Sequence, residues 1–169
     1  MAVRETRIIE GARLMFKNFS GAESEYNQAG DRNFCVVLDP EVAEEMKEVG
    51  WNVKELPPRP GYEDEGPTYY IKVKLSYRFE ERAPMIIRFI GSDRKHRQTL
   101  TERTVSSLDW DELENVDLEI RPYNWDKGSR NGVTAYLKSM YVTVKSDPLG
   151  EKYGVYSDPQ GTEEEVPFT

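Results

Sequence analysis

Residues 69–79 read YYIKVKLSYRF, and this stretch decides the fold class because apolar and polar residues alternate along it. One face carries aromatic and aliphatic side chains, and the other carries Tyr70, Lys72, Lys74, Ser76 and Arg78. A period of two residues is typical of a half-buried β-strand. The stretch therefore predicts a strand with an apolar core face and a strongly basic outer face. We expect the rings in its apolar phase, Tyr69, Tyr77 and Phe79, to pack in the core together with Phe89.

Other segments predict further strands, at residues 11–20, 32–38, 51–56, 85–90, 116–125 and 133–145. In the first of these, Ala12, Leu14 and Phe16 form the apolar phase. Asp39 and Pro40 predict the start of a helix that ends at Gly50, with the Asp39 carboxylate as its cap. Asp109 and Glu112 resemble a capping box for a short helix over residues 110–114. Short strands with little room for crossover helices predict a mainly β fold. We expect a five-stranded antiparallel barrel with extra hairpin strands and one or two short helices.

Charge is distributed unevenly along the 169 residues, whose formal net charge is -8. Residues 147–169 contain six acidic residues against one basic residue, whereas residues 68–103 contain nine basic against four acidic residues. Polar, acidic segments with glycine and proline are typical of disordered tails. The sequence therefore predicts a single domain over residues 1–145 and a flexible acidic tail over residues 146–169.

Catalytic signatures are absent from the sequence. A single histidine and a single cysteine cannot make a common zinc site, and no phosphate-binding glycine motif occurs. Cys35 lies inside an apolar strand, so we expect it to pack in the core. Asp109, Asp111, Glu112 and Glu114 leave a Mg²⁺ site for nucleic-acid hydrolysis open as an alternative, although capping is the simpler role. We expect no enzyme activity, metal or cofactor.

The cysteine content and the distribution of apolar residues predict the cellular compartment of the protein. A lone cysteine, the lack of a hydrophobic signal core and the lack of an apolar run of about 20 residues predict a cytoplasmic protein with no membrane partner.

Cations and aromatic rings share the outer faces of three predicted strands. Such a combination suits single-stranded nucleic acids, which are held by phosphate contacts and by stacking of bases on rings. The alternative is that alternating lysines merely form the wet face of a sheet, but the recurrence of the pattern on three strands favours a groove. The predicted DNA-binding residues are Arg13, Lys17, Tyr70, Lys72, Lys74, Arg78, Arg88, Arg94, Lys95, Arg97, Arg121, Tyr123, Trp125, Tyr136 and Lys138.

The last eight residues, TEEEVPFT, resemble the acidic Pro-Phe C-terminal tip of bacterial single-stranded-DNA-binding proteins. The resemblance implies that the tail binds replication or recombination proteins. Its partner-binding residues would be Glu163, Glu164, Glu165, Val166, Pro167 and Phe168. This chain departs from the pattern because Thr169 follows the phenylalanine. A partner pocket that clamps the carboxylate of a terminal phenylalanine would bind this tip less tightly.

The body is similar to phage-encoded single-stranded-DNA-binding proteins in the segments 26–34 (YNQAGDRNF), 50–54 (GWNVK), 121–125 (RPYNW) and 135–142 (AYLKSMYV). This resemblance implies an oligonucleotide-binding (OB) fold and a host-cell cytoplasmic setting.

Together these observations predict a protein that coats single-stranded DNA with little sequence preference during phage DNA replication or recombination. A structural virion or assembly barrel and a metal-dependent nuclease remain the alternatives. The sequence leaves open the choice of DNA or RNA, the site size, the cooperativity and whether the protein forms a homo-oligomer.

Overall fold

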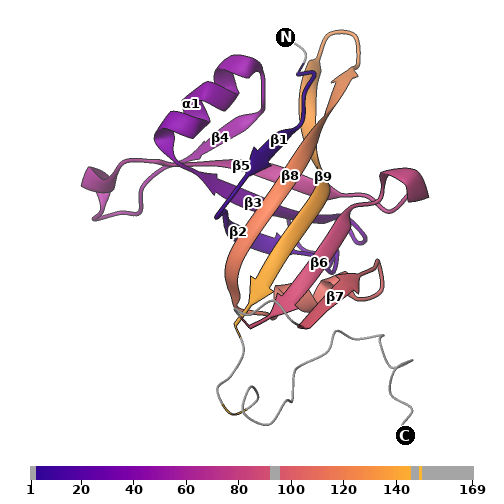
Figure 1. The fold of residues 1–169 in the computed structure, drawn as a ribbon. Helices are drawn as coiled ribbons and strands as arrows, with labels where there is room; N and C mark the ends of the chain where they lie inside the picture. The colour runs from indigo at the N-terminus through magenta and orange to yellow at the C-terminus, as the bar shows by residue number, and fades with distance from the viewer. Residues whose placement is uncertain (1–2, 92–95, 146–148, 150–169) are drawn as a thin grey trace, which may run out of the picture.

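The computed structural model describes residues 3–91, 96–145 and 149. Strands dominate this part of the chain, with one α-helix and three short 3-10 helices (Figure 1). In chain order the elements are β1 Arg7–Ile9, β2 Arg13–Asn18, β3 Arg32–Leu38, α1 Pro40–Val49, β4 Val53–Leu56, η1 Glu63–Glu65, β5 Thr68–Leu75, η2 Glu80–Arg82, β6 Met85–Ile90, β7 His96–Leu100, η3 Val105–Asp109, β8 Leu113–Asp126 and β9 Asn131–Val144. The predicted mainly β fold is confirmed, while the predicted tail lies outside the described residues.

Helix α1 lies beside β4 and β5 and begins and ends where the sequence predicts (Figure 1). Pro40 occupies the first turn, and Gly50 ends the helix with φ of 123°. Asp39 stands at the cap position, but its side chain makes no capping hydrogen bond, contrary to prediction. Ala43 and Met46 are buried against the sheet, whereas Val49 is exposed.

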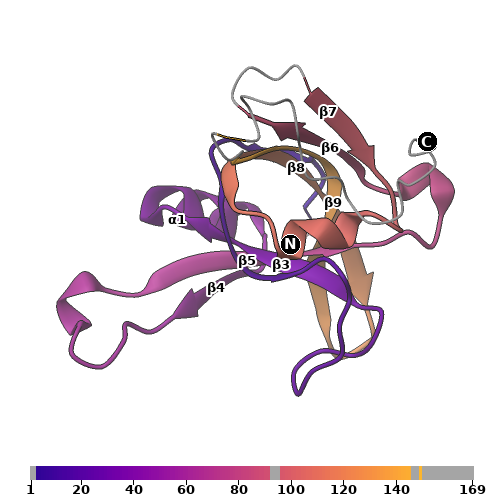
Figure 2. The same ribbon diagram turned by 90° about the horizontal axis from the view of Figure 1, so that it is seen from below.

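The described strands form one sheet whose main path runs β1-β8-β9-β5-β3-β2. Most neighbouring strands are antiparallel, as predicted, but β9 runs parallel to both β5 and β6. The sheet is therefore mixed and open, not a wholly antiparallel barrel. Viewed from below, it curls so that β3 and β5 lie across from β8 and β9, with η3 at the near end (Figure 2).

The core fills the inside of this curl. Its members come from the inward phases of β3, β5, β6, β8 and β9, and they include Phe34, Ile71, Ile86, Ile120 and Met140. Tyr69 and Tyr77 pack against this core, as predicted. Phe79 does not, since β5 ends at Leu75 and the ring beyond it is 47% exposed. Phe89 is also outside the core cluster, because β6 turns its neighbours Arg88 and Ile90 inward.

One extra residue in β2 reverses the inside and outside positions along this strand. Between the pairs Met15–Cys35 and Asn18–Asn33, three steps along β2 face two steps along β3, which is a β-bulge. A slip of one residue sends every later side chain to the other face of a sheet. Phe16, predicted for the core, is consequently exposed, and Lys17, predicted for the surface, is half-buried.

Three elements differ from the predicted ones. The sequence pattern missed β1 and β7, which are short strands of three and five residues. The predicted helix over residues 110–114 is replaced by η3, which ends at Asp109 before β8 begins at Leu113. No helix in the described part of the chain is long and apolar enough to cross a membrane.

Candidate nucleic-acid interface

Strand β5 displays its basic side chains on the face opposite the core. Ile71, Val73 and Leu75 are buried, and the alternate residues Lys72 and Lys74 are half-buried with Tyr70 on the outer face. This arrangement agrees with the sequence pattern, because successive side chains of a strand point to opposite faces.

Neighbouring strands align further cations with this face. Tyr70 is paired with Lys54 of β4 on one side and with Val37 of β3 on the other, and Val37 is paired with Arg13 of β2. Residues directly opposite each other on paired strands point to the same side of the sheet. Lys54 and Arg13 therefore extend the basic face of β5 across β4 and β2.

Cys35 is buried under this surface, outside the main core cluster. It is paired with Lys72, so its thiol faces the outer side, where it is nevertheless buried. Burial raises the pKa of the thiol, and the nearby ammonium groups of Lys72 and Lys54 partly oppose this. The predicted burial is confirmed, and Cys35 is buried on the outer side because β3 is buried on both faces.

Strands β9 and β8 carry the surface onward with aromatic rings. Lys74 is paired with Tyr136, and Tyr136 with Arg121. The Arg121 guanidinium lies 5.0 Å from the centroid of the Tyr136 ring, and the Tyr123 ring meets Tyr136 edge-on at 6.1 Å. We call the aligned set the outer stripe; it comprises Arg13, Lys54, Tyr70, Lys72, Lys74, Arg121, Tyr123 and Tyr136.

A depression of about 200 Å³ lies within the outer stripe, between the start of β4 and the part of β9 that pairs with β5. Lys54, Lys72 and Lys74 line it together with Thr134 of β9. Three ammonium groups around one hollow favour an anionic ligand.

Few acids balance these cations. Lys54, Lys72 and Arg121 form no ion pair within the described residues, and Lys74 lies 3.9 Å from Asp31. Burial lowers the pKa of Arg121, and the nearby guanidinium of Arg82 lowers it further. Unpaired like charges repel one another, and a bound polyanion would remove that repulsion.

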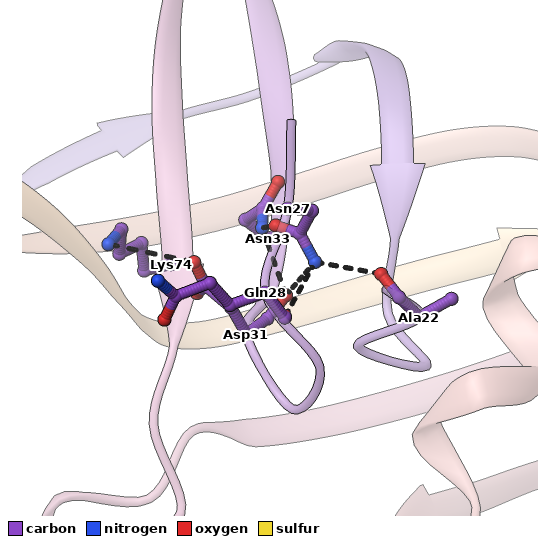
Figure 3. Close-up of polar contacts among 6 residues, drawn as sticks. All are labelled: Ala22, Asn27, Gln28, Asp31, Asn33 and Lys74. Atoms are coloured by element: carbon purple, nitrogen blue, oxygen red, sulfur yellow. Dashed lines mark hydrogen bonds and ion pairs between the residues drawn. The ribbon is translucent and has the colours of Figure 1, made fainter. Parts of the chain in front are cut away.

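The loop between β2 and β3 approaches the stripe and is held by asparagine side chains. The Asn27 amide donates hydrogen bonds to the carbonyl oxygens of Ala22, Gln28 and Asp31 at 2.9 to 3.1 Å (Figure 3). Asn33 donates to the Asn27 oxygen at 2.8 Å. These bonds fix Asp31, which is the acidic neighbour of Lys74.

Trp125 lies farther along β8, on the same phase as Arg121 and Tyr123. Its ring covers Gly132 on β9, where an added Cβ would come within 2.7 Å of the indole. The close fit half-buries the indole, so Trp125 offers less free ring than Tyr123.

Five of the other predicted residues are placed elsewhere. Arg88 is 1% exposed, and its guanidinium donates hydrogen bonds to both carboxylate oxygens of Asp111 and to the side-chain oxygen of Gln98.

The other four residues have contacts of their own. Lys17 donates to the carbonyl oxygens of Leu108 and Asp111. Lys138 occupies a bulge in β9, 3.6 Å from Glu119. Arg97 lies on β7, and Arg78 follows the end of β5 beside Phe79. Arg94 and Lys95 lie outside the described residues.

The acidic cluster around residues 109–114 has structural partners. Asp109 accepts hydrogen bonds from the backbone N–H groups of Phe19 and Ser20 at 2.7 and 2.9 Å. Asp111 pairs with Arg88, and Glu112 lies 3.4 Å from Lys145. Among the described residues, no group of three or more His, Cys, Asp or Glu side chains is arranged to hold a metal ion.

Lys54 and Arg82 are surface residues that the sequence pattern did not single out, and Phe79 is a surface residue that it assigned to the core. Lys54 could have been found from its polar phase in the predicted strand over residues 51–56, but nothing indicated that it pairs with Tyr70. The Phe79 ring lies between Arg78 and Arg82, at 5.2 and 5.9 Å from their guanidinium carbons. Arg82 lies close enough to Arg121, a residue of the outer stripe, for its charge to lower the pKa of Arg121.

Residues 2–164 match the family model described as "Putative phage ssDNA-binding domain". The chain belongs to this family. The resemblance of the body to phage single-stranded-DNA-binding proteins is thereby confirmed, over nearly the whole sequence. No curated protein sequence matches the chain at a significant level.

Solved structures of a phage protein share the fold of this family member. The single-stranded DNA-binding protein from bacteriophage Enc34 in complex with ssDNA matches with a TM-score of 0.54 at 14% identity, covering 86% of this chain and 89% of that one. A second structure of the same Enc34 protein matches with a TM-score of 0.52 at 14% identity, covering 86% of this chain and 84% of that one. At this identity the likeness establishes the fold.

Proposed function

We propose that this protein binds single-stranded DNA along the outer stripe, with little sequence preference, and coats it during phage DNA replication or recombination. Membership of the phage ssDNA-binding family supports this function. The observation that carries the proposal is the alignment of unpaired cations and rings across β4, β5, β9 and β8, by the strand register.

The dimensions and chemistry of the outer stripe suit an unpaired strand. Five neighbouring strands, β2, β3, β5, β9 and β8, span about 19 Å at about 4.8 Å per strand. Lysine and arginine side chains along this width neutralise phosphates, while Tyr70, Tyr123 and Tyr136 offer rings on which bases stack. Stacking needs exposed base faces, which a duplex does not present, so the rings favour single strands.

Fluorescence anisotropy with labelled oligo(dT) over a salt series tests this function. We expect Lys54→Ala/Lys72→Ala to weaken binding and to flatten the slope of log K against log salt by about 0.7 per lost phosphate contact. Tyr136→Ala should weaken binding at every salt concentration, because stacking releases no counterions.

Lys47→Ala is the matched control for the lysine variants. Lys47 lies over the Tyr69 ring, on the side of β5 opposite Tyr70, so its loss removes one positive charge away from the stripe. If wild type fails to bind oligo(dT), or if Lys47→Ala and the double lysine variant behave alike, the proposal is wrong.

A structural virion or assembly role is the second candidate. It predicts that the same oligonucleotide leaves anisotropy unchanged while an acidic protein binds the stripe. A nuclease is disfavoured by the contacts of Asp109 and Asp111, whose carboxylates already bind backbone N–H groups and Arg88. We therefore propose binding without catalytic turnover.

Partner recruitment by the acidic tail is a separate part of the proposal. It rests on the sequence of residues 163–168, EEEVPF, in which an apolar tip follows three carboxylates. Pro167 and Phe168 would enter an apolar pocket on a replication or recombination protein, and Glu163, Glu164 and Glu165 would meet basic residues around it. Co-purification of phage or host replication proteins with wild type, lost on Phe168→Ala, would support this role.

A further inference from the structure

Phe16 combines two features that are each unfavourable for folding. Its φ is 54°, the only positive value at a non-glycine residue in the described part of the chain. A bulky side chain rarely adopts this left-handed conformation. The ring is also 61% exposed, so little apolar burial offsets the strain.

The bulge of β2 explains how the ring reaches the surface. Met15 faces outward opposite Cys35, and regular alternation would turn Phe16 inward beside Leu14. The extra residue instead leaves both Met15 and Phe16 outside and turns Lys17 toward the carbonyl oxygens of Leu108 and Asp111. Bulges commonly re-aim a side chain next to a functional site.

The Phe16 ring is located at the β2 end of the outer stripe. It meets the Tyr70 ring edge-on, with 6.4 Å between the centroids and 82° between the planes. Tyr70 is flanked by Lys54 across the strand pair and by Lys72 along its own strand face. An exposed flat ring thus stands beside a second ring and two cations, which is the composition of a base-stacking site.

The contacts of the inward Lys17 explain why β2 has a bulge. They do not explain why the residue in the bulge is a phenylalanine. Glycine adopts positive φ without strain, so it would build the same bulge at lower cost. When a position keeps a strained residue although glycine would avoid the strain, the side chain is indicated to have a function.

We propose that Phe16 is a base-stacking residue that, together with Tyr70, forms a subsite for one unpaired base at the β2 end of the outer stripe. This inference rests on the proposed single-stranded-DNA-binding function. It adds a residue that the alternation of the sequence assigns to the core.

Phe16→Gly tests the proposal, because it removes the ring and relieves the strain in one step. We expect an unchanged or higher Tm together with a loss of affinity for oligo(dT) of roughly 5- to 150-fold, as expected for one lost stacking contact. A lower Tm would mean that the ring holds the fold, and affinity equal to wild type would mean that it does not stack; either result overturns the inference.

Phe16→Leu and Phe16→Trp are the matched variants. Leucine keeps an apolar side chain under the same backbone strain but offers no flat ring, so its affinity should fall as that of Phe16→Gly does. Tryptophan keeps a ring and should bind at least as tightly as wild type. Leucine binding like wild type would contradict stacking.

Photo-crosslinking of the full-length wild-type protein to oligonucleotides that carry 5-iodouracil gives an independent readout. We expect a crosslink in the peptide that contains Phe16. If wild type binds no oligo(dT), the proposed function itself fails. If wild type binds and Tyr136→Ala weakens it, while neither the crosslink nor the Phe16→Gly effect occurs, only the Phe16 subsite is wrong.

Discussion

Arg88 is buried, although it was predicted to bind DNA at the surface. Its guanidinium is 2.8 Å from Asp111 and is enclosed by the core, whereas the Asp111 side chain is 16% exposed. A buried charge without its partner is strongly unfavourable, whereas a buried pair can be replaced by apolar side chains at little cost.

We predict that Arg88→Met lowers the free energy of unfolding by about 3 kcal/mol, because it leaves the half-buried Asp111 carboxylate without its partner. The double variant Arg88→Met/Asp111→Leu should recover most of that loss. Urea denaturation followed by tryptophan fluorescence measures both. Equal destabilisation in the single and double variants would show that the pair itself is not the cause.

Tyr77 carries a buried hydroxyl that has no hydrogen-bond partner within the described residues. Burial raises the pKa of Tyr77 to about 12; the cation of Arg32 opposes this, and the carboxylate of Glu102 adds to it. The unfolded chain ionises this group near pH 10. Ionisation of Tyr77 therefore does not penalise folding below about pH 10, and the folded state loses stability as the pH rises through that value toward 12.

We predict that Tyr77→Phe stabilises the protein by about 1 kcal/mol at pH 8, because it removes an unsatisfied hydroxyl. The advantage over wild type should grow by about 1–2 kcal/mol at pH 11, after allowance for the partial exposure of the group. Urea unfolding at the two pH values measures this change. Tyr62→Phe, at an exposed tyrosine, is the control, and a difference that stays constant with pH would contradict the pKa argument.

The loop between β2 and β3 shows how a connecting element depends on one side chain. The Asn27 side chain donates hydrogen bonds to three backbone carbonyl oxygens and accepts one from Asn33 (Figure 3). These bonds take the place of the backbone hydrogen bonds that paired strands make and a loop does not. Asn33 is itself 7% exposed and stands opposite Lys74, which ties the loop to the outer stripe.

We predict that Asn27→Ala increases amide hydrogen exchange in residues 21–31 while exchange in β8 and β9 stays unchanged. The lost bonds are local, and loops open independently of the core. Gln28→Ala is the matched control, because in the described structure only the backbone of Gln28 takes part in this network. Equal exchange in the two variants would contradict the role of the Asn27 side chain.

At the scale of the whole molecule, opposite charges are separated along the chain. Residues 147–169 carry six acidic residues against one basic residue, and the outer stripe is cationic. A tethered polyanion has a high effective concentration at a nearby basic surface, and salt screens the attraction. We propose that the tail competes with DNA for the outer stripe.

We predict that a chain ending at Lys145 binds oligo(dT) more tightly than full-length protein at low salt, and that the difference disappears at high salt. Glu163→Gln/Glu164→Gln/Glu165→Gln in the full-length chain should act in the same direction. Anisotropy titrations measure both. Binding by the shortened chain that is no tighter than wild type would end the autoinhibition proposal.

How much could be predicted depends on how local the cause is. Residues 69–79 revealed the inward and outward phases of β5, because alternation is a property of neighbouring residues. The same reasoning failed in β2, where the bulge reverses the phase, and at Arg88, where a distant carboxylate stabilises an inward charge. The stripe residues Tyr70, Lys72, Tyr123 and Tyr136 were predicted, whereas Lys54 and Phe16 needed knowledge of their partner strands.

The sequence by itself determined the mainly β class, the position of helix α1 and the basic face of β5, since all three follow from the spacing of residues close in the chain. Only the tertiary structure decided that β9 runs parallel to β5 and that Cys35 faces outward. It also decided which cations are free to meet a ligand. Strand pairing and charge neutralisation join residues far apart in sequence, and no local pattern encodes which distant partner a strand or a charge will meet.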